Sequence, residues 1–130
     1  MATYDYAVLR VVPRVERGEF VNVGVLLSCA AQRYLKAAIE VDAARLKALA
    51  PTLDLAAVCD GLDAIRRVCE GGAAAGALGR LSVRERFHWL VAPRSGVIQT
   101  SPVHTGRCDD LDATLDRLMQ RMVRPPADSR

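Results

Sequence analysis

The side chains with the clearest capacity for chemistry flank a short polar loop near the N-terminus. Arg10 interrupts an apolar run before this loop, and Asn22 and Gly24 lie in the apolar run that follows it. If the two runs form a hairpin, Arg10 lies roughly opposite Asn22, and both share a face with Gly24. A charged side chain within a strand requires a partner or a route to water. The candidate partners of Arg10 are Glu16, Glu19 and an anionic ligand.

Two interpretations of this hairpin remain open. In the first, Arg10 and Glu19 form a structural ion pair at the edge of the sheet, and Gly24 makes room for a helix. Such structural pairs are the commoner use of these groups. In the second, Arg10 and Asn22 bind a ligand, because glycine within a strand often marks the close approach of a ligand or another backbone.

The loop itself is basic and contains a glycine. Arg14 and Arg17 offer the bidentate geometry that suits a phosphate, and Gly18 can expose backbone N–H groups to it. The chain contains neither the G-x-x-x-x-G-K-S/T pattern of a P-loop nor the G-x-G-x-x-G pattern of a dinucleotide site. Solvated charge is the commoner explanation for such a loop, and phosphate binding is the alternative.

A second polar cluster precedes the C-terminal segment, and its members are Arg94, Ser95, Gln99, His104, Gly106 and Arg107. We expect His104 in a loop between Pro102 and Gly106. A loop histidine that titrates near neutrality could act as a general acid or base, or bind phosphate together with Arg107. Alternatively, His104 holds the loop in place through hydrogen bonds to the backbone.

Hydrophobic periodicity and turn residues predict the elements that position these side chains. We expect strands at 5–12, 20–30, 34–40, 88–92 and 97–101, and helices at 42–49, 53–70 and 110–123. This order favours an α+β fold, a single domain in which a largely antiparallel sheet packs with about three helices. The domain is expected to span residues 1–124, with a loose tail at 125–130.

Two local patterns refine this expectation. Strict alternation in the strand at 20–30 would place five core residues on one face and the polar positions on the other. The core face is Val21, Val23, Val25, Leu27 and Cys29, and the opposite face is Phe20, Asn22, Gly24, Leu26 and Ser28. Ser82 and Glu85 have the spacing of a capping box, which predicts a short helical turn before Phe87.

Composition excludes several classes of function. The chain has 130 residues and a net charge of +3, which rests on sixteen arginines against two lysines. With only six aromatic residues and no basic patch among them, nucleic-acid binding is not favoured. No apolar run could cross a bilayer, and the four cysteines form no C-x-x-C pair, so we expect a reduced, cytoplasmic protein. The two histidines, His88 and His104, complete no metal-ligand set, and no cofactor is expected.

Two blocks of sequence resemble a known family. Tyr4-x-Tyr6 followed by VLRVVPRVERGEFVNVGVLL, and the later FHWLVAPRSGVIQTSPVHTGRCDD, are similar to an uncharacterised bacterial domain-of-unknown-function family of short proteins. The resemblance covers Tyr4 to Val123 and implies no established reaction. It implies a partner, a kinase-like protein related to the HipA toxin class. The positions that it carries over are Arg10, Pro13, Arg17, Glu19, Asn22, Gly24, Arg94, Ser95, Gln99, His104 and Gly106.

The sequence therefore favours an accessory or binding module that acts through a protein partner, such as a HipA-like kinase, or through a small anionic ligand. The alternative is an enzyme that acts on a phosphate-containing or nucleotide substrate. In that case His104 is the acid or base, and Arg17 or Arg94 holds the anion. Convergence of His104, Arg17, Asn22 and Arg94 in one cleft would favour an active or ligand site, and dispersion would favour structural roles.

Overall fold

The sheet is organised around its longest strand, β1 (Ala2–Val11), which pairs with neighbours along both of its edges. In the computed structural model, which describes residues 1–126, β2 (Val21–Cys29) lies antiparallel to one edge of β1. Two short strands, β4 (Ile98–Thr100) and β5 (His104–Cys108), share the other edge. Since β3 (Tyr34–Ile39) pairs antiparallel with the outer edge of β2, the sheet is antiparallel throughout.

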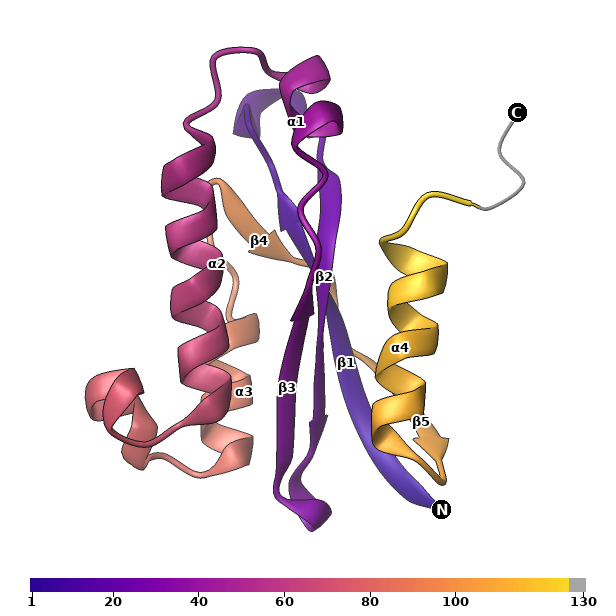
Figure 1. Cartoon of the computed structure of the whole chain (residues 1–130). Coiled ribbons are helices and arrows are strands. Elements are labelled where there is room, and N and C mark those ends of the chain that lie inside the picture. The colour runs from indigo at the N-terminus through magenta and orange to yellow at the C-terminus, as the bar shows by residue number, and fades with distance from the viewer. Residues whose placement is uncertain (127–130) are drawn as a thin grey trace.

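Helices cover the two faces of this sheet unequally, which confirms the predicted α+β class (Figure 1). One face packs against α1 (Ala43–Leu49), α2 (Leu55–Glu70) and α3 (Val83–Val91). Among residues 1–126, α4 (Leu111–Met122) is the one helix that packs on the other face. Three short 3-10 segments complete the described elements, and they are Val15–Arg17, Ala30–Gln32 and Ala73–Arg80. No helix within residues 1–126 has the length and apolar character needed to cross a membrane.

The boundaries of α1, α2 and α4 agree with the predicted helices to within two residues. Each begins at an aspartate whose carboxylate accepts the backbone N–H three residues later, and these aspartates are Asp42, Asp54 and Asp110. Such N-caps satisfy donors that a helix leaves unpaired, and the signal is local in sequence. Of the predicted tail at 125–130, residues 127–130 lie outside the described part of the chain.

Two predicted elements in the C-terminal half are wrong. Of residues 88–92, predicted as a strand, 88–91 belong to α3, which begins at a complete capping box formed by Ser82 and Glu85. His104, predicted in a loop between Pro102 and Gly106, lies instead in β5, which covers residues 104–108. This strand depends on long-range pairing with the N-terminal half of β1, since Tyr6 lies opposite His104 and Tyr4 opposite Gly106.

A β-bulge in β2 overturns the prediction that five alternate residues of this strand share one face. Leu9 lies opposite Gly24 and Arg10 opposite Asn22, so Val23 is the extra residue. An extra residue shifts the alternation of side chains by one position. As a result Val21 and Val23 pack on the side of α2, whereas the later residues Val25, Leu27 and Cys29 pack beneath α4.

The same bulge moves Gly24 off the face that it was predicted to share with Arg10 and Asn22. A Cβ atom at Gly24 would lie 2.5 Å from the carbonyl oxygen of Ala38 on β3 and 3.2 Å from Leu9 Cδ1, which belongs to the core beneath α2. Gly24 therefore makes room for the backbone of the neighbouring strand and not for a helix or a ligand.

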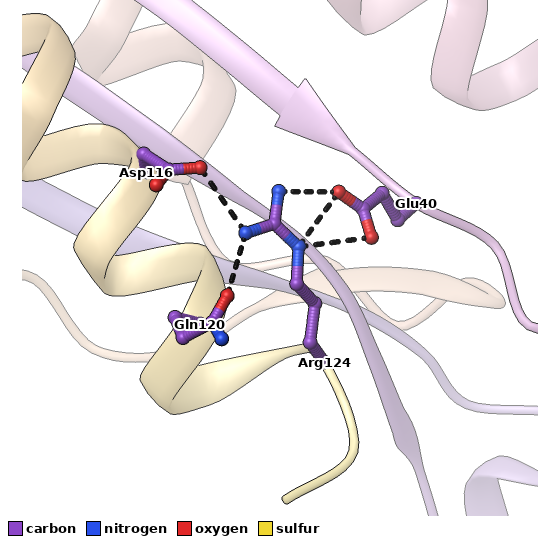
Figure 2. A network of polar contacts seen from close by, with 4 residues as sticks. All are labelled: Glu40, Asp116, Gln120 and Arg124. Carbon is purple, nitrogen blue, oxygen red and sulfur yellow. Dashed lines mark hydrogen bonds and ion pairs between the residues drawn. The ribbon is translucent and has the colours of Figure 1, made fainter. Parts of the chain in front are cut away.

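Polar contacts along one flank of α4 tie this helix to β3. Arg124 donates to both carboxylate oxygens of Glu40, to Asp116 at 3.1 Å and to Gln120 at 2.8 Å (Figure 2). The hydrogen bond from Arg124 lowers the pKa of Glu40 below its ordinary value. The contact therefore stabilises the fold above that ordinary pKa and is lost as pH falls through the lowered one.

Candidate functional site

Arg10 lies at the centre of a polar row that crosses three strands. It is opposite Asn22 on β2, as predicted, and opposite Gln99 on β4. Its neighbours Leu9 and Val11 point into the core beneath α2, so the side chain of Arg10 points to the α4 side of the sheet. We call the surface formed by Arg10, Asn22 and Phe20 the Arg10 face.

The guanidinium of Arg10 stacks on an aromatic ring and forms no ion pair with Glu19. Its Cζ atom lies 4.1 Å from the ring centroid of Phe20, a residue that is 44% exposed. Its Nε atom is buried and has no hydrogen-bond partner in the described chain. Glu19 is bound by Arg17, with Nε–Oε1 at 2.6 Å, so the expected structural pair between Arg10 and Glu19 is absent from residues 1–126.

Of the two polar atoms in the side chain of Asn22, one has a hydrogen-bond partner within residues 1–126. Its Nδ2 atom donates to the carbonyl oxygen of Met122 at 3.0 Å, which anchors the C-terminal end of α4. Its Oδ1 atom is buried and, like Arg10 Nε, has no partner within residues 1–126. Asn22 also lines a depression of 350 Å³ at this end of the helix, together with Glu40 and Arg124.

The two unpartnered atoms carry the physical argument for a site. Leaving a buried donor or acceptor unsatisfied costs about 1–3 kcal/mol, so folded proteins rarely retain such groups without a use. Arg10 Nε is a donor and Asn22 Oδ1 an acceptor, and their residues are cross-strand neighbours. The Arg10 face therefore offers complementary hydrogen-bonding capacity that the described chain does not use.

His104 shares this side of the sheet but lies away from the Arg10 face. Its ring packs on Tyr6 with centroids 5.2 Å apart, and Tyr6 precedes Arg10 by four residues on the same side of β1. Four residues of strand span about 13 Å. Gly106 has a steric role, since a Cβ atom there would lie 2.5 Å from the hydroxyl oxygen of Tyr4.

The remaining candidates of the second cluster have local roles. Arg94 donates to the carbonyl oxygens of Leu90 and Trp89, both at 2.8 Å, and so caps the end of α3. The side-chain amide of Gln99 donates to the carbonyl of Gly96 at 2.9 Å, and Ser95 lies exposed in the same turn.

The structure thus separates the four residues whose convergence would have favoured one cleft. Asn22 contacts the end of α4, and His104 packs on Tyr6. Arg17 is paired with Glu19 in the exposed loop, and Arg94 caps α3. Among the predicted candidates, Arg10 lies opposite Asn22 and Gln99 on the neighbouring strands, and Arg17 pairs with Glu19.

Sequence reasoning missed the basic flank of α4. Asp112 and Asp116 lie on the flank that contacts β3. At 100° per residue, Arg117 and Arg121 fall on the opposite flank, which faces the β1 side of the sheet. Both arginines are exposed, and Arg121 directly precedes Met122, whose carbonyl oxygen accepts a hydrogen bond from Asn22 of the Arg10 face. The helical period of the final segment predicts that Arg117 and Arg121 share one flank. Which strand this flank faces follows only from the strand order of the sheet.

Fold and site together define a small α+β domain whose antiparallel sheet carries a polar, partly unsatisfied patch beside a single covering helix. Residues 6–123 match the family described as "Protein of unknown function (DUF3037)", and the chain belongs to this family. No curated protein and no solved structure matches the chain. The family match confirms the resemblance to a domain-of-unknown-function family, so the function must be argued from the residues.

Proposed function

We propose that this chain is a non-enzymatic accessory module that binds an acidic segment of a protein partner at the Arg10 face. The observation that carries the proposal is the pair of buried atoms without partners, Arg10 Nε and Asn22 Oδ1. An ionised carboxylate, or a phosphate ester that has lost both protons, offers acceptors only, so it would satisfy Arg10 and leave Asn22 Oδ1 unpaired. A peptide supplies both groups, a side-chain carboxylate for Arg10 and a backbone N–H for Asn22.

The surroundings of the two residues support a protein partner over a free anion. Phe20 is 44% exposed beside Arg10 and can serve as an apolar anchor. Arg117 and Arg121 extend the positive charge along α4, which would raise the association rate of an acidic segment. The family resemblance suggests a HipA-like kinase as the partner, and we propose that such a kinase carries the segment.

The alternative, an enzyme that uses His104 on a phosphate-containing substrate, requires an arginine beside the imidazole. Of the arginines considered for His104, Arg17 is paired with Glu19, and Arg94 lies at the end of α3, on the other side of the sheet. Arg107 follows His104 by three residues on β5, so its side chain points to the opposite side of the strand. His104 packs on the ring of Tyr6. These contacts favour the binding module.

Loss of Arg10 is expected to weaken the complex at least tenfold, because a hydrogen bond to a charged group is worth about 1.5–3 kcal/mol. The test is calorimetric titration of the HipA-like kinase from the same genome with the wild type, Arg10→Met and Arg80→Met. Methionine keeps the length and much of the apolar volume of the side chain. Arg80 is exposed on the 3-10 segment after α2, so its replacement removes the same charge far from the Arg10 face and should change the affinity less than about twofold.

Equal affinities of the wild type and Arg10→Met would overturn the proposed site. A wild type that binds no kinase, although it is folded, would remove the HipA-like kinase as the partner. Thermal unfolding of each variant establishes that a lost signal reflects binding and not the fold.

A further inference from the structure

A small apolar cavity lies on the side of the sheet opposite the Arg10 face, between α2, α3 and β4. Its volume is 180 Å³, and its walls are mainly apolar, including Leu9, Ile65, Val68 and Ile98. Trp89 and Arg94 also line it, and both are exposed, so the cavity opens to solvent between α3 and the turn that precedes β4.

The cavity exists because α2 presents very small residues to β4. Gly61 sits within this helix although an interior glycine costs about 1 kcal/mol relative to alanine. A Cβ atom at Gly61 would lie 2.7 Å from Cδ1 at the end of the Ile98 side chain, so any other residue there would require Ile98 to shift. Ala64, nearly one turn later, also lines the cavity and leaves its volume open.

Trp89 forms a wall of the cavity without filling it. The side chain is 44% exposed, and Arg94 Cζ lies 4.5 Å from the ring centroid. The guanidinium is held in this position by hydrogen bonds to the carbonyls of Trp89, Leu90 and Ala92. Within residues 1–126 no carboxylate pairs with Arg94, so the cavity has a pre-positioned cation at its mouth.

Size and charge together limit what the cavity can hold. An apolar protein cavity of about 150 Å³ accommodates benzene, whereas pockets for drug-sized ligands start at about 300 Å³. A volume of 180 Å³ therefore accepts one ring with a short substituent and excludes a nucleotide. The cation at the mouth favours an acid, since a carboxylate and a guanidinium form charge-assisted hydrogen bonds.

We propose that this cavity binds a single-ring aromatic carboxylate, with the ring between α2 and Trp89 and the carboxylate on Arg94. The proposal is independent of the Arg10 face, because the two sites lie on opposite sides of the sheet and share no residue among those argued to bind. In this proposal Gly61 and Ala64 keep space for the ring, and Arg94 binds the carboxylate.

The chain has a single tryptophan, so its fluorescence reports directly on this cavity. Phenylacetate is titrated into the wild type, and a saturable change in Trp89 emission is expected. Arg94→Met should weaken binding at least tenfold, whereas Arg80→Met should leave it unchanged. Ala64→Leu fills the cavity, so it should abolish the saturable signal while thermal unfolding shows an equal or higher midpoint.

Benzyl alcohol has the same ring but no charge, so it separates the contribution of the ring from that of the carboxylate. It should bind at least tenfold more weakly than phenylacetate. Equal binding of the two compounds would overturn the assignment of a carboxylate to Arg94. An unchanged phenylacetate affinity in Ala64→Leu, or no saturable signal in the wild type, would overturn the site itself.

Discussion

Replacing Gly24 with alanine is expected to lower the free energy of unfolding by about 2–3 kcal/mol, the upper part of the range for overpacked cores. The added Cβ atom would lie 2.5 Å from the carbonyl oxygen of Ala38. Because that oxygen belongs to the backbone of β3, it can move only if the paired strands β2 and β3 separate locally. The loss is measured by urea denaturation at equilibrium.

Gly96→Ala is the matched control for this experiment. Gly96 lies in an exposed turn, and a Cβ atom there would meet nothing within 4 Å. Its replacement should change the free energy of unfolding by less than about 0.5 kcal/mol. If Gly24→Ala were as stable as the control, the close packing of β3 against the bulge in β2 would be wrong.

Ser101→Ala is expected to cost about 1–3 kcal/mol, the penalty for leaving a buried donor without an acceptor. Ser101 is buried at the junction of β4 and β5. Its hydroxyl oxygen accepts the backbone N–H of Val8 at 2.8 Å, and its own N–H donates to the carbonyl of Val8 at 2.8 Å. Alanine keeps the second bond and removes the first, so the N–H of Val8 loses its acceptor inside the sheet.

Ser95→Ala provides the comparison, because Ser95 is exposed in the turn before β4. Urea denaturation of both variants should show a loss for Ser101→Ala and almost none for Ser95→Ala. Similar stabilities would mean that the side chain of Ser101 does not join the two short strands to β1.

The parts of the fold that depend on local chemistry were predictable from the sequence. The N-caps at Asp42, Asp54 and Asp110 lie next to the helices that they start, and each predicted helix is present. α3 was missed although its capping box was recognised. Its last residues, from His88 to Val91, include β-branched and aromatic types, and they resemble a strand when the helical spacing of Phe87 and Leu90 is overlooked.

Features that depend on distant partners were not predictable. β5 forms because residues 104–108 reach the first residues of β1, about one hundred positions earlier in the chain. The bulge at Val23 is likewise invisible to an alternation rule, since only the register between β1 and β2 shows which residue is extra.

The candidate site likewise contains features that were predictable from the sequence and features that were not. The opposition of Arg10 and Asn22 followed from the hairpin and is confirmed by the register. The sequence did not show that Arg17 forms an ion pair with Glu19, or that Arg10 stacks on Phe20. Several acidic and aromatic residues near the loop compete for each arginine, and the backbone geometry of the loop selects among them.

The most direct test of the proposed function follows the Nε–H resonance of Arg10 by NMR in ¹⁵N-labelled protein. This group has no acceptor within the described chain, whereas the Nε–H of Arg17 is already bonded to Glu19 at 2.6 Å. Addition of saturating HipA-like kinase is predicted to shift the Arg10 resonance strongly and to leave that of Arg17 in place. A bound kinase that leaves the Arg10 resonance unchanged would contradict the assignment of the Arg10 face as the binding site.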